Sequence, residues 1–147
     1  MAGRFASLPL PRLLREPALG LFVSHYQVNL EEAEKKLIEY PSLQEFFTRR
    51  LKPGLRPQEA PVPGYLNSPV DGKILSEGRI HQGALFQAKG KTYALGELLL
   101  SESDLTVFEG GSFLTIYLAP YNYHRFHMPC EAQVTSLREI DGDLWPV

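Results

Sequence analysis

The sequence contains a single cysteine, Cys130, among 147 residues. One cysteine excludes an internal disulfide and a metal site built from clustered cysteines, and it suits a reducing compartment. Long apolar runs are also missing: no stretch of about 18 apolar residues is present, so the sequence predicts no membrane-spanning helix. Neither sign of charge dominates, because 15 Lys and Arg accompany 17 Asp and Glu. Near-neutral charge without a block of basic residues gives no electrostatic signature of nucleic-acid binding, and no nucleic-acid partner is expected.

The remaining composition is that of a folded protein. Hydrophobic residues make up 44% of the chain and charged residues 22%, which excludes a disordered polypeptide. The 12 glycines and 12 prolines favour a fold rich in turns and strands. The length suits one domain with a core of its own.

The N-terminal segment is apolar but is interrupted by prolines at positions 9, 11 and 17. A secretory signal needs an unbroken apolar run of roughly 7–15 residues, which this segment lacks. Arginines beside large apolar residues are typical of a segment that lies in a membrane surface. The alternative is that the apolar residues pack against the body of the protein. The residues concerned are Phe5, Leu8, Leu10, Leu13, Leu14, Leu19, Leu21, Phe22 and Val23, with Arg4, Arg12 and Arg15 between them.

Two helices are predicted in the next part of the chain. Asn29 and Ser42 are good N-caps, and each is followed three residues later by a glutamate, as in a capping box. The first helix is predicted over residues 30–39 and the second over residues 43–50. Cations at the end of the second helix favour its dipole. They are Arg49, Arg50 and Lys52.

Short β-prone runs begin after residue 58. Strands are predicted at residues 72–80, 84–89, 112–119 and 132–140, with one short helix at 95–100. Residues 113–118 are apolar on both faces, as in an inner strand. Helices followed by strands predict an α+β fold, with a mostly antiparallel β-rich region. We divide the chain into a helical segment over residues 1–57, which contacts a membrane in one interpretation, and a β-rich catalytic domain over residues 58–147.

Two of the four histidines, His124 and His127, lie in one loop directly after the strongest predicted strand. A rigid scaffold fixes such a loop, and imidazole exchanges protons near neutral pH, so this loop is a candidate catalytic site. The alternative is that both are ordinary hydrogen-bonded loop histidines.

Asp71 is the second candidate. Asp71-Gly72 after a proline is by itself a turn signal. Asp71 becomes a catalytic candidate only if folding brings it to one of the histidines, because a carboxylate there sets the imidazole tautomer and stabilises its cation.

Several segments, in order along the chain, carry a family resemblance. Residues 117–120 and 123–129 resemble the histidine motif of phosphatidylserine decarboxylases, particularly the bacterial type. Residues 68–72 are similar to the aspartate motif of the same family. Other similar segments are residues 40–52, Arg56-Pro57, residues 87–95 and Gly142-Asp143-Leu144. The resemblance extends from about Leu21 to Val147.

The resemblance implies a self-processing lyase. In the family, a serine in a Gly-Ser-Thr motif cleaves the chain and becomes a covalent pyruvoyl group on the small chain. Asp71 and His127 match the aspartate and histidine that activate this serine, and His124 matches the histidine assigned mainly to decarboxylation. The implied reaction converts phosphatidylserine to phosphatidylethanolamine in phospholipid biosynthesis, with the pyruvoyl group as the electron sink.

The sequence departs from the family at the processing serine, which lies downstream of the histidine motif in family members. Ser112 follows two glycines but lies upstream of the histidines and precedes Phe113 where the family has Thr, so we interpret it as part of a turn. We expect this sequence to match most of the large (beta) chain of the family and to be truncated before the processing serine. Its β-rich domain would then be incomplete at the C-terminus, and the chain would be inactive by itself.

The resemblance also implies partners. These are a phospholipid membrane, phosphatidylserine and the pyruvoyl-bearing small chain of the same proenzyme, with a homodimer as one option. The implied location is peripheral, on the cytoplasmic side of the cytoplasmic membrane.

Two other functions stay open at this point. A catalytically inert, membrane-associated relative of the decarboxylase fold would also lack the processing serine. A metal-dependent hydrolase could use Asp71, His124 and His127, although two imidazoles three residues apart are a weak metal signal without a further ligand nearby. We otherwise expect no metal.

Overall fold

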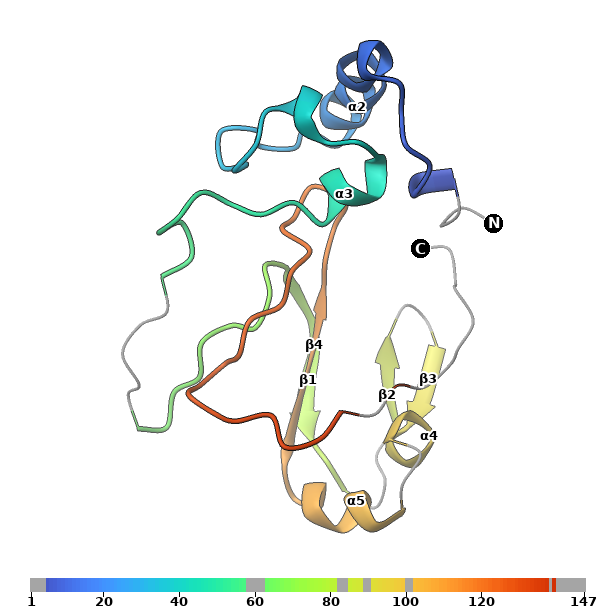
Figure 1. The fold of residues 1–147 in the computed structure, drawn as a ribbon. Helices are drawn as coiled ribbons and strands as arrows, with labels where there is room; N and C mark the ends of the chain where they lie inside the picture. Colours follow the sequence, from blue (N-terminus) through green and yellow to red (C-terminus); the bar gives the residue numbers. More distant parts are fainter. Residues whose placement is uncertain are drawn as a thin grey trace. The chain divides into compact units, whose positions relative to one another are not determined.

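A computed structural model describes residues 5–57, 63–81, 85–88, 91–99, 102–137 and 139. The chain forms two compact units: unit 1 comprises Met1–Gly72 and Leu118–Ala132, and unit 2 comprises Lys73–Tyr117 and Gln133–Val147. Helices come first along the chain and antiparallel strands follow, so the fold is α+β as predicted (Figure 1). The proposed division at residues 57 and 58 stays a prediction.

The first long helix of unit 1 is α2, Arg12–Tyr26, which continues through Pro17. The sequence suggested short segments separated by prolines, and the structure corrects this. A proline inside a helix removes one backbone hydrogen bond, and burial of an apolar face can compensate. Leu19 supplies such burial, with 1% of its surface exposed. None of the helices in the described residues is both long and apolar enough to cross a membrane.

The core of unit 1 is a hydrophobic cluster that joins α2 to the segments after it. Phe46 and Tyr40 meet edge to face, with ring centroids 5.3 Å apart, and Phe22 packs on Phe46 in the same manner. Arg15 connects α2 to the neighbouring segments, because its side chain donates hydrogen bonds to the carbonyls of Leu10 and Ile38. The buried members of the cluster are Leu19, Val28, Tyr40 and Phe46.

The helix predicted over residues 30–39 is wrong. Only η1, a single 3-10 turn at Leu37–Glu39, is helical there. Asn29 accepts a hydrogen bond from the Glu31 backbone N–H and makes a local turn instead of capping a helix. The Glu34 N–H donates to the Arg50 carbonyl, and Ala33 bridges Leu51. Residues 32–34 thus pair with residues 50–52. This pairing uses the backbone N–H and C=O groups that a helix over residues 30–39 would need for its own hydrogen bonds.

The second predicted helix is confirmed but is shorter. Helix α3 spans Leu43–Phe47, and Ser42 Oγ accepts from the Glu45 N–H at 3.2 Å, as its N-cap role requires. Thr48 follows as the C-cap. Arg49 and Arg50 therefore lie beyond the helix and not in its last turn.

Unit 2 contains two antiparallel strand pairs. Strand β1, Lys73–Arg79, pairs with β4, Ser112–Tyr117, and β2, Leu85–Ala88, pairs with β3, Lys91–Ala94 (Figure 1). The strands predicted at 72–80, 84–89 and 112–119 are confirmed. In the described part of unit 2, β4 pairs with β1, and its assignment as an inner strand stays a prediction.

Two helices complete the described part of unit 2. Helix α4, Leu95–Leu99, confirms the predicted short helix, whereas β3 and helix α5, Glu102–Phe108, were not foreseen. The strand predicted at 132–140 does not form over residues 132–137, and positions 138 and 140 lie outside the described residues. Its apolar residues are spaced three apart and give no alternating face; Val134 and Leu137 are exposed.

Candidate functional site

The aspartate segment and the histidine loop lie side by side in unit 1. The His127 backbone N–H donates to the Pro69 carbonyl at 2.7 Å, and the Asn67 N–H donates to the Pro129 carbonyl at 2.9 Å. Asp71 and His127 consequently line the same pocket, with a volume of about 230 Å³. Asp71 was a catalytic candidate only if folding brought it to one of the histidines. The shared pocket meets this condition.

Asp71 is held by Arg56. Arg56 Nε donates to Oδ1 at 2.9 Å, and Nη2 donates to Oδ2 at 2.7 Å, so the pair is bidentate. Arg56 Nη2 also pairs with Glu32 at 3.1 Å. The Arg56 hydrogen bond lowers the pKa of Asp71; partial burial opposes this, and a Tyr123 backbone hydrogen bond and the His127 charge lower it further. Asp71 is therefore a fixed anion at neutral pH.

His127 lies in the histidine loop and also borders the pocket that contains Asp71. Its Nε2 lies 3.1 Å from the Tyr123 hydroxyl, and the two rings are tilted with centroids 5.5 Å apart. Both carboxylate oxygens of Asp71 accept hydrogen bonds from Arg56, and the charge of His127 contributes to the lowered pKa of Asp71.

His124 has a different environment. Its ring stacks on Phe47, with centroids 3.8 Å apart and an interplanar angle of 28°. Burial is the largest cause that lowers the pKa of His124; the charge of Arg49 lowers it further, against a hydrogen bond to Ala119 that raises it. His124 Nε2 lies 3.0 Å from the Ala119 carbonyl, which can only accept, so Nε2 carries the proton. In neutral His124 the lone pair is therefore on Nδ1.

Arg49 positions the loop that carries His124. It is 3% exposed, and its Nη2 donates to the carbonyls of Tyr121 and Asn122 at 3.0 and 3.3 Å. Burial lowers the pKa of Arg49 below the usual value of an arginine. The sequence suggested a role in the helix dipole, which the structure corrects, because Arg49 reaches a loop more than seventy residues further along the chain.

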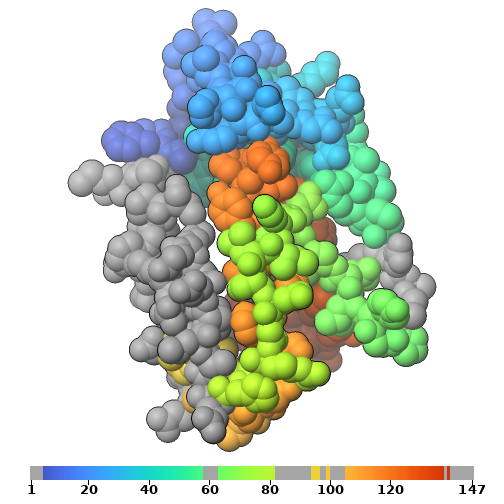
Figure 2. Space-filling model, turned by 180° about the vertical axis from the view of Figure 1, so that it is seen from behind, coloured from blue at the N-terminus to red at the C-terminus, as the bar shows by residue number. Residues whose placement is uncertain are grey.

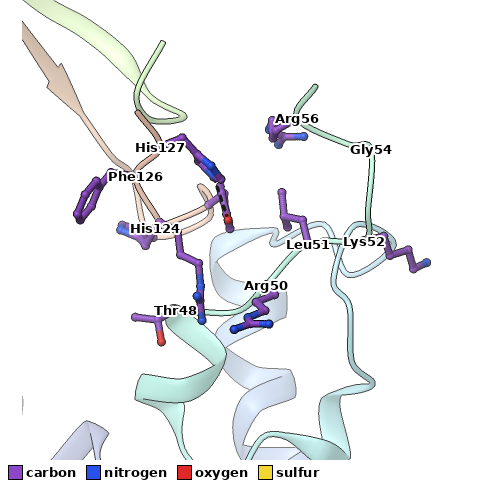
Figure 3. Close-up of a pocket in the computed structure, with 11 residues that line it drawn as sticks. Thr48, Arg50, Leu51, Lys52, Gly54, Arg56, His124, Phe126 and His127 are labelled. Atoms are coloured by element: carbon purple, nitrogen blue, oxygen red, sulfur yellow. Dashed lines mark hydrogen bonds between the residues drawn. The ribbon is translucent and has the colours of Figure 1, made fainter. Parts of the chain in front are cut away.

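A larger pocket in unit 1 opens beside both histidines, and we call it the cationic pocket. Its volume is about 570 Å³, and its lining includes four cationic side chains and no carboxylate. Figure 3 shows Thr48 and Arg50 at one end, and Arg56 with His127 at the other. Its lining residues are Thr48, Arg50, Leu51, Lys52, Gly54, Arg56, Tyr123, His124, Arg125, Phe126 and His127. Such a lining favours an anionic ligand.

The sequence analysis also considered Ser112 and a metal site. Ser112 is exposed at the first position of β4, in unit 2, where it pairs with Arg79. Within the described ranges, no three His, Cys, Asp or Glu side chains are grouped so that they could hold a metal ion together. The sequence analysis did not single out Arg56 or Tyr123 as site residues, and it did not predict that Arg49 is buried. All three lie in segments that carry the family resemblance: residues 40–52, Arg56-Pro57 and residues 123–129.

The site and the α+β fold together define a class: a protein that brings an anionic aspartate and two imidazoles to pockets with a basic lining. The family model for phosphatidylserine decarboxylase matches residues 43–147. The chain belongs to the phosphatidylserine decarboxylase family, a family of carbon–carbon lyases.

Relatives named phosphatidylserine decarboxylase proenzyme align with almost the whole chain. The protein from Brevibacillus brevis is 44% identical over 146 residues, which cover 99% of this chain and 50% of that protein. The protein from Myxococcus xanthus is 41% identical over 147 residues, covering 100% of this chain and 52% of that protein. The chain thus spans about half the length of these curated relatives.

Proposed function

We propose that this chain forms the aspartate- and histidine-bearing part of a phosphatidylserine decarboxylase, which removes carbon dioxide from phosphatidylserine to give phosphatidylethanolamine. The observation that carries the proposal is the pocket that Asp71 and His127 share, in a chain that belongs to this family. A negatively charged lipid headgroup also suits the cationic pocket beside them.

Asp71 and His127 are assigned to the self-processing step. In this role His127 takes a proton from the attacking serine hydroxyl, and Asp71 supports the positive charge that the imidazole gains. The ionised state of Asp71, held by Arg56, supports the assignment, since a protonated aspartate would carry no charge. The serine is assigned to the pyruvoyl-bearing small chain as partner.

His124 is assigned to the decarboxylation step. A pyruvoyl group, when bound, supplies a carbonyl that draws electrons from the bond being broken. The donors present fit such a group, because imidazoles that exchange protons border the cationic pocket together with the Tyr123 hydroxyl. Since Nε2 of His124 is bound to the Ala119 carbonyl, a proton given or taken by His124 moves at Nδ1.

The test is to join this chain to the remaining half of the Brevibacillus brevis relative and to measure self-cleavage and decarboxylation separately. Asp71→Asn and His127→Asn should slow self-cleavage at least about a hundredfold, the usual contribution of a general base. His124→Asn should still cleave but lose most decarboxylation. Intact mass reports cleavage, and phosphatidylethanolamine formed from labelled phosphatidylserine reports the reaction.

A matched control is His81→Gln, because His81 is an exposed histidine of unit 2 outside the site. It should leave both readouts unchanged. Cleavage at the normal rate in Asp71→Asn would contradict the assignment of Asp71. A cleaved joined protein without any decarboxylation would favour the inert relative.

Peripheral membrane binding on the cytoplasmic side is the proposed location, with α2 as the contacting element. Several apolar side chains of α2 and the segment before it are exposed, among them Leu13 at 91% and Leu21 at 75%. Figure 2 shows α2 in blue at the surface. Exposed apolar residues beside Arg12 suit a phospholipid surface, whereas Arg15 is occupied by carbonyls of its own unit. A homodimer stays an open prediction.

Vesicle flotation tests the membrane proposal. The Leu13→Glu/Leu21→Glu variant should float with anionic phospholipid vesicles several-fold less than the unmodified chain, because each change removes apolar area and adds repulsion. Ser24→Glu is the control on the same helix: it adds a charge at an exposed position without removing apolar area. Equal flotation of the double variant and the unmodified chain would overturn the proposal.

A further inference from the structure

The four cations of the cationic pocket are not equivalent. Arg56 is neutralised by two carboxylates, Asp71 and Glu32. Lys52 points away from His124 and His127 (Figure 3). Arg50 and Arg125 remain, and within the described part of the chain neither forms an ion pair with a carboxylate. These two arginines therefore supply the uncompensated positive charge of the pocket.

Arg125 is held in place by the backbone. Its Nε donates to the Thr48 carbonyl at 2.8 Å, directly after α3. A guanidinium that is fixed through Nε keeps two Nη groups, and their N–H bonds match the geometry of a planar or tetrahedral oxyanion. Less side-chain entropy is lost on binding, because the side chain is already ordered.

Arg50 lies at the same end of the pocket as Thr48 (Figure 3). Its backbone is fixed by the bond from the Glu34 N–H to its carbonyl, while its side chain is exposed. Glu34 and Glu45 border a neighbouring hollow that Arg50 and Arg125 also line, and they do not line the cationic pocket. Arg50 and Arg125 thus flank the end that is far from Arg56, the partner of Asp71, and among the described residues neither guanidinium is paired with a carboxylate.

We propose that Arg50 and Arg125 form a phosphate subsite that binds the phosphodiester of the phospholipid headgroup. This inference rests on the proposed function and assigns part of its substrate to named residues. The carboxylate of the substrate is the group that leaves as carbon dioxide, so cations bound to it would stabilise the ground state and oppose the reaction. Cations on the phosphodiester, which does not react, use binding energy to position the substrate.

Soluble headgroups test the subsite on the chain as it stands, by isothermal titration. We expect glycerophosphoserine and glycerophosphoethanolamine to bind with similar affinity, because both carry the phosphodiester. Serine alone should bind much more weakly. Arg50→Gln and Arg125→Gln should each weaken glycerophosphoserine binding about tenfold, the effect of losing a hydrogen bond to a charged group. Arg125→Lys should recover only part of the loss, because lysine keeps the charge without the paired donors.

Lys36→Gln is the matched control, since it removes one positive charge from an exposed residue outside both pockets. It should leave binding unchanged; an equal loss would show a general charge effect and overturn the subsite. Binding of glycerophosphoserine without glycerophosphoethanolamine would assign the arginines to the carboxylate and overturn the proposal. Inorganic phosphate that binds as tightly as glycerophosphoserine would overturn the lipid source of the ligand.

The proposed function is tested by measurements that do not depend on these binding results. Its failure appears as absent cleavage or absent decarboxylation in the joined protein, whereas the subsite is read by headgroup binding. In an active joined protein, Arg50→Gln should raise KM about tenfold with little change in self-cleavage, since the subsite touches only the substrate.

Discussion

The hydrophobic cluster of unit 1 and the β1–β4 pair of unit 2 differ in how their apolar residues are buried. In unit 1, Phe46 and Leu19 are almost completely buried, at 0% and 1% exposure. In unit 2, Ile74 and Leu114 of the β1–β4 pair are about half exposed, at 56% and 49%. The candidate site belongs to the unit with the buried cluster. A loop can hold catalytic groups in place only where its supports are fixed, and α3 and Arg49 are such supports.

The largest expected effect comes from the core of unit 1. Phe46→Ala should lower the free energy of unfolding by about 3–5 kcal/mol, because it removes a fully buried aromatic ring and leaves a cavity. Leu114→Ala in unit 2 should cost less than about 1 kcal/mol, since that side chain is half exposed. Urea unfolding measures both. Equal losses of unfolding free energy in the two variants would contradict the contrast between the units.

Arg49→Met should lower the free energy of unfolding by about 1–2 kcal/mol, because the carbonyls of Tyr121 and Asn122 lose their donor. It should also raise the pKa of His124, since the charge of Arg49 lowers it. Arg50→Met, at the exposed neighbour, should change stability by less than about 0.5 kcal/mol. Unfolding curves and an NMR titration of His124 provide the measurements. An unchanged pKa of His124 would contradict the coupling.

Gly78→Ala tests the tightest contact described in unit 2. A Cβ at Gly78 would lie 2.8 Å from Cε1 of Phe113, so the ring must move. We expect a loss of about 1 kcal/mol, because the end of a side chain can shift at moderate cost. Phe113→Leu should relieve the clash in the double variant. A double-variant cycle without any coupling would show that the two residues are not in contact.

Arg56→Gln should have a small effect on stability, below about 1 kcal/mol, because the Arg56–Asp71 pair is partly exposed. The folded state lowers the pKa of Asp71, so this contribution is present above the unfolded pKa and is lost as pH falls through the folded pKa. The two proteins should therefore differ at neutral pH and converge in acid. Lys52→Gln, which removes a nearby charge, should show no such pH dependence.

Local signals were reliable where neighbours in sequence decide the structure. Ser42 caps α3 as expected, and the alternation in residues 113–118 marks β4. The same reasoning failed at Asn29, whose capping signal was as good as that of Ser42. There the partners of residues 32–34 are residues 50–52, which no local pattern indicates. Arg49 and Arg50 are likewise indistinguishable in sequence, yet one is buried and the other exposed.

The sequence by itself determined the α+β class, the candidate residues Asp71, His124 and His127, and the family, because short motifs record which chemical groups are present and in what order. Tertiary structure alone decided which groups meet. The His127 N–H donates to the Pro69 carbonyl, so the segments that carry Asp71 and His127 lie side by side within unit 1. Contacts of this kind join residues more than fifty positions apart, and the burial that shifts the pKa of His124 exists only once those segments have packed.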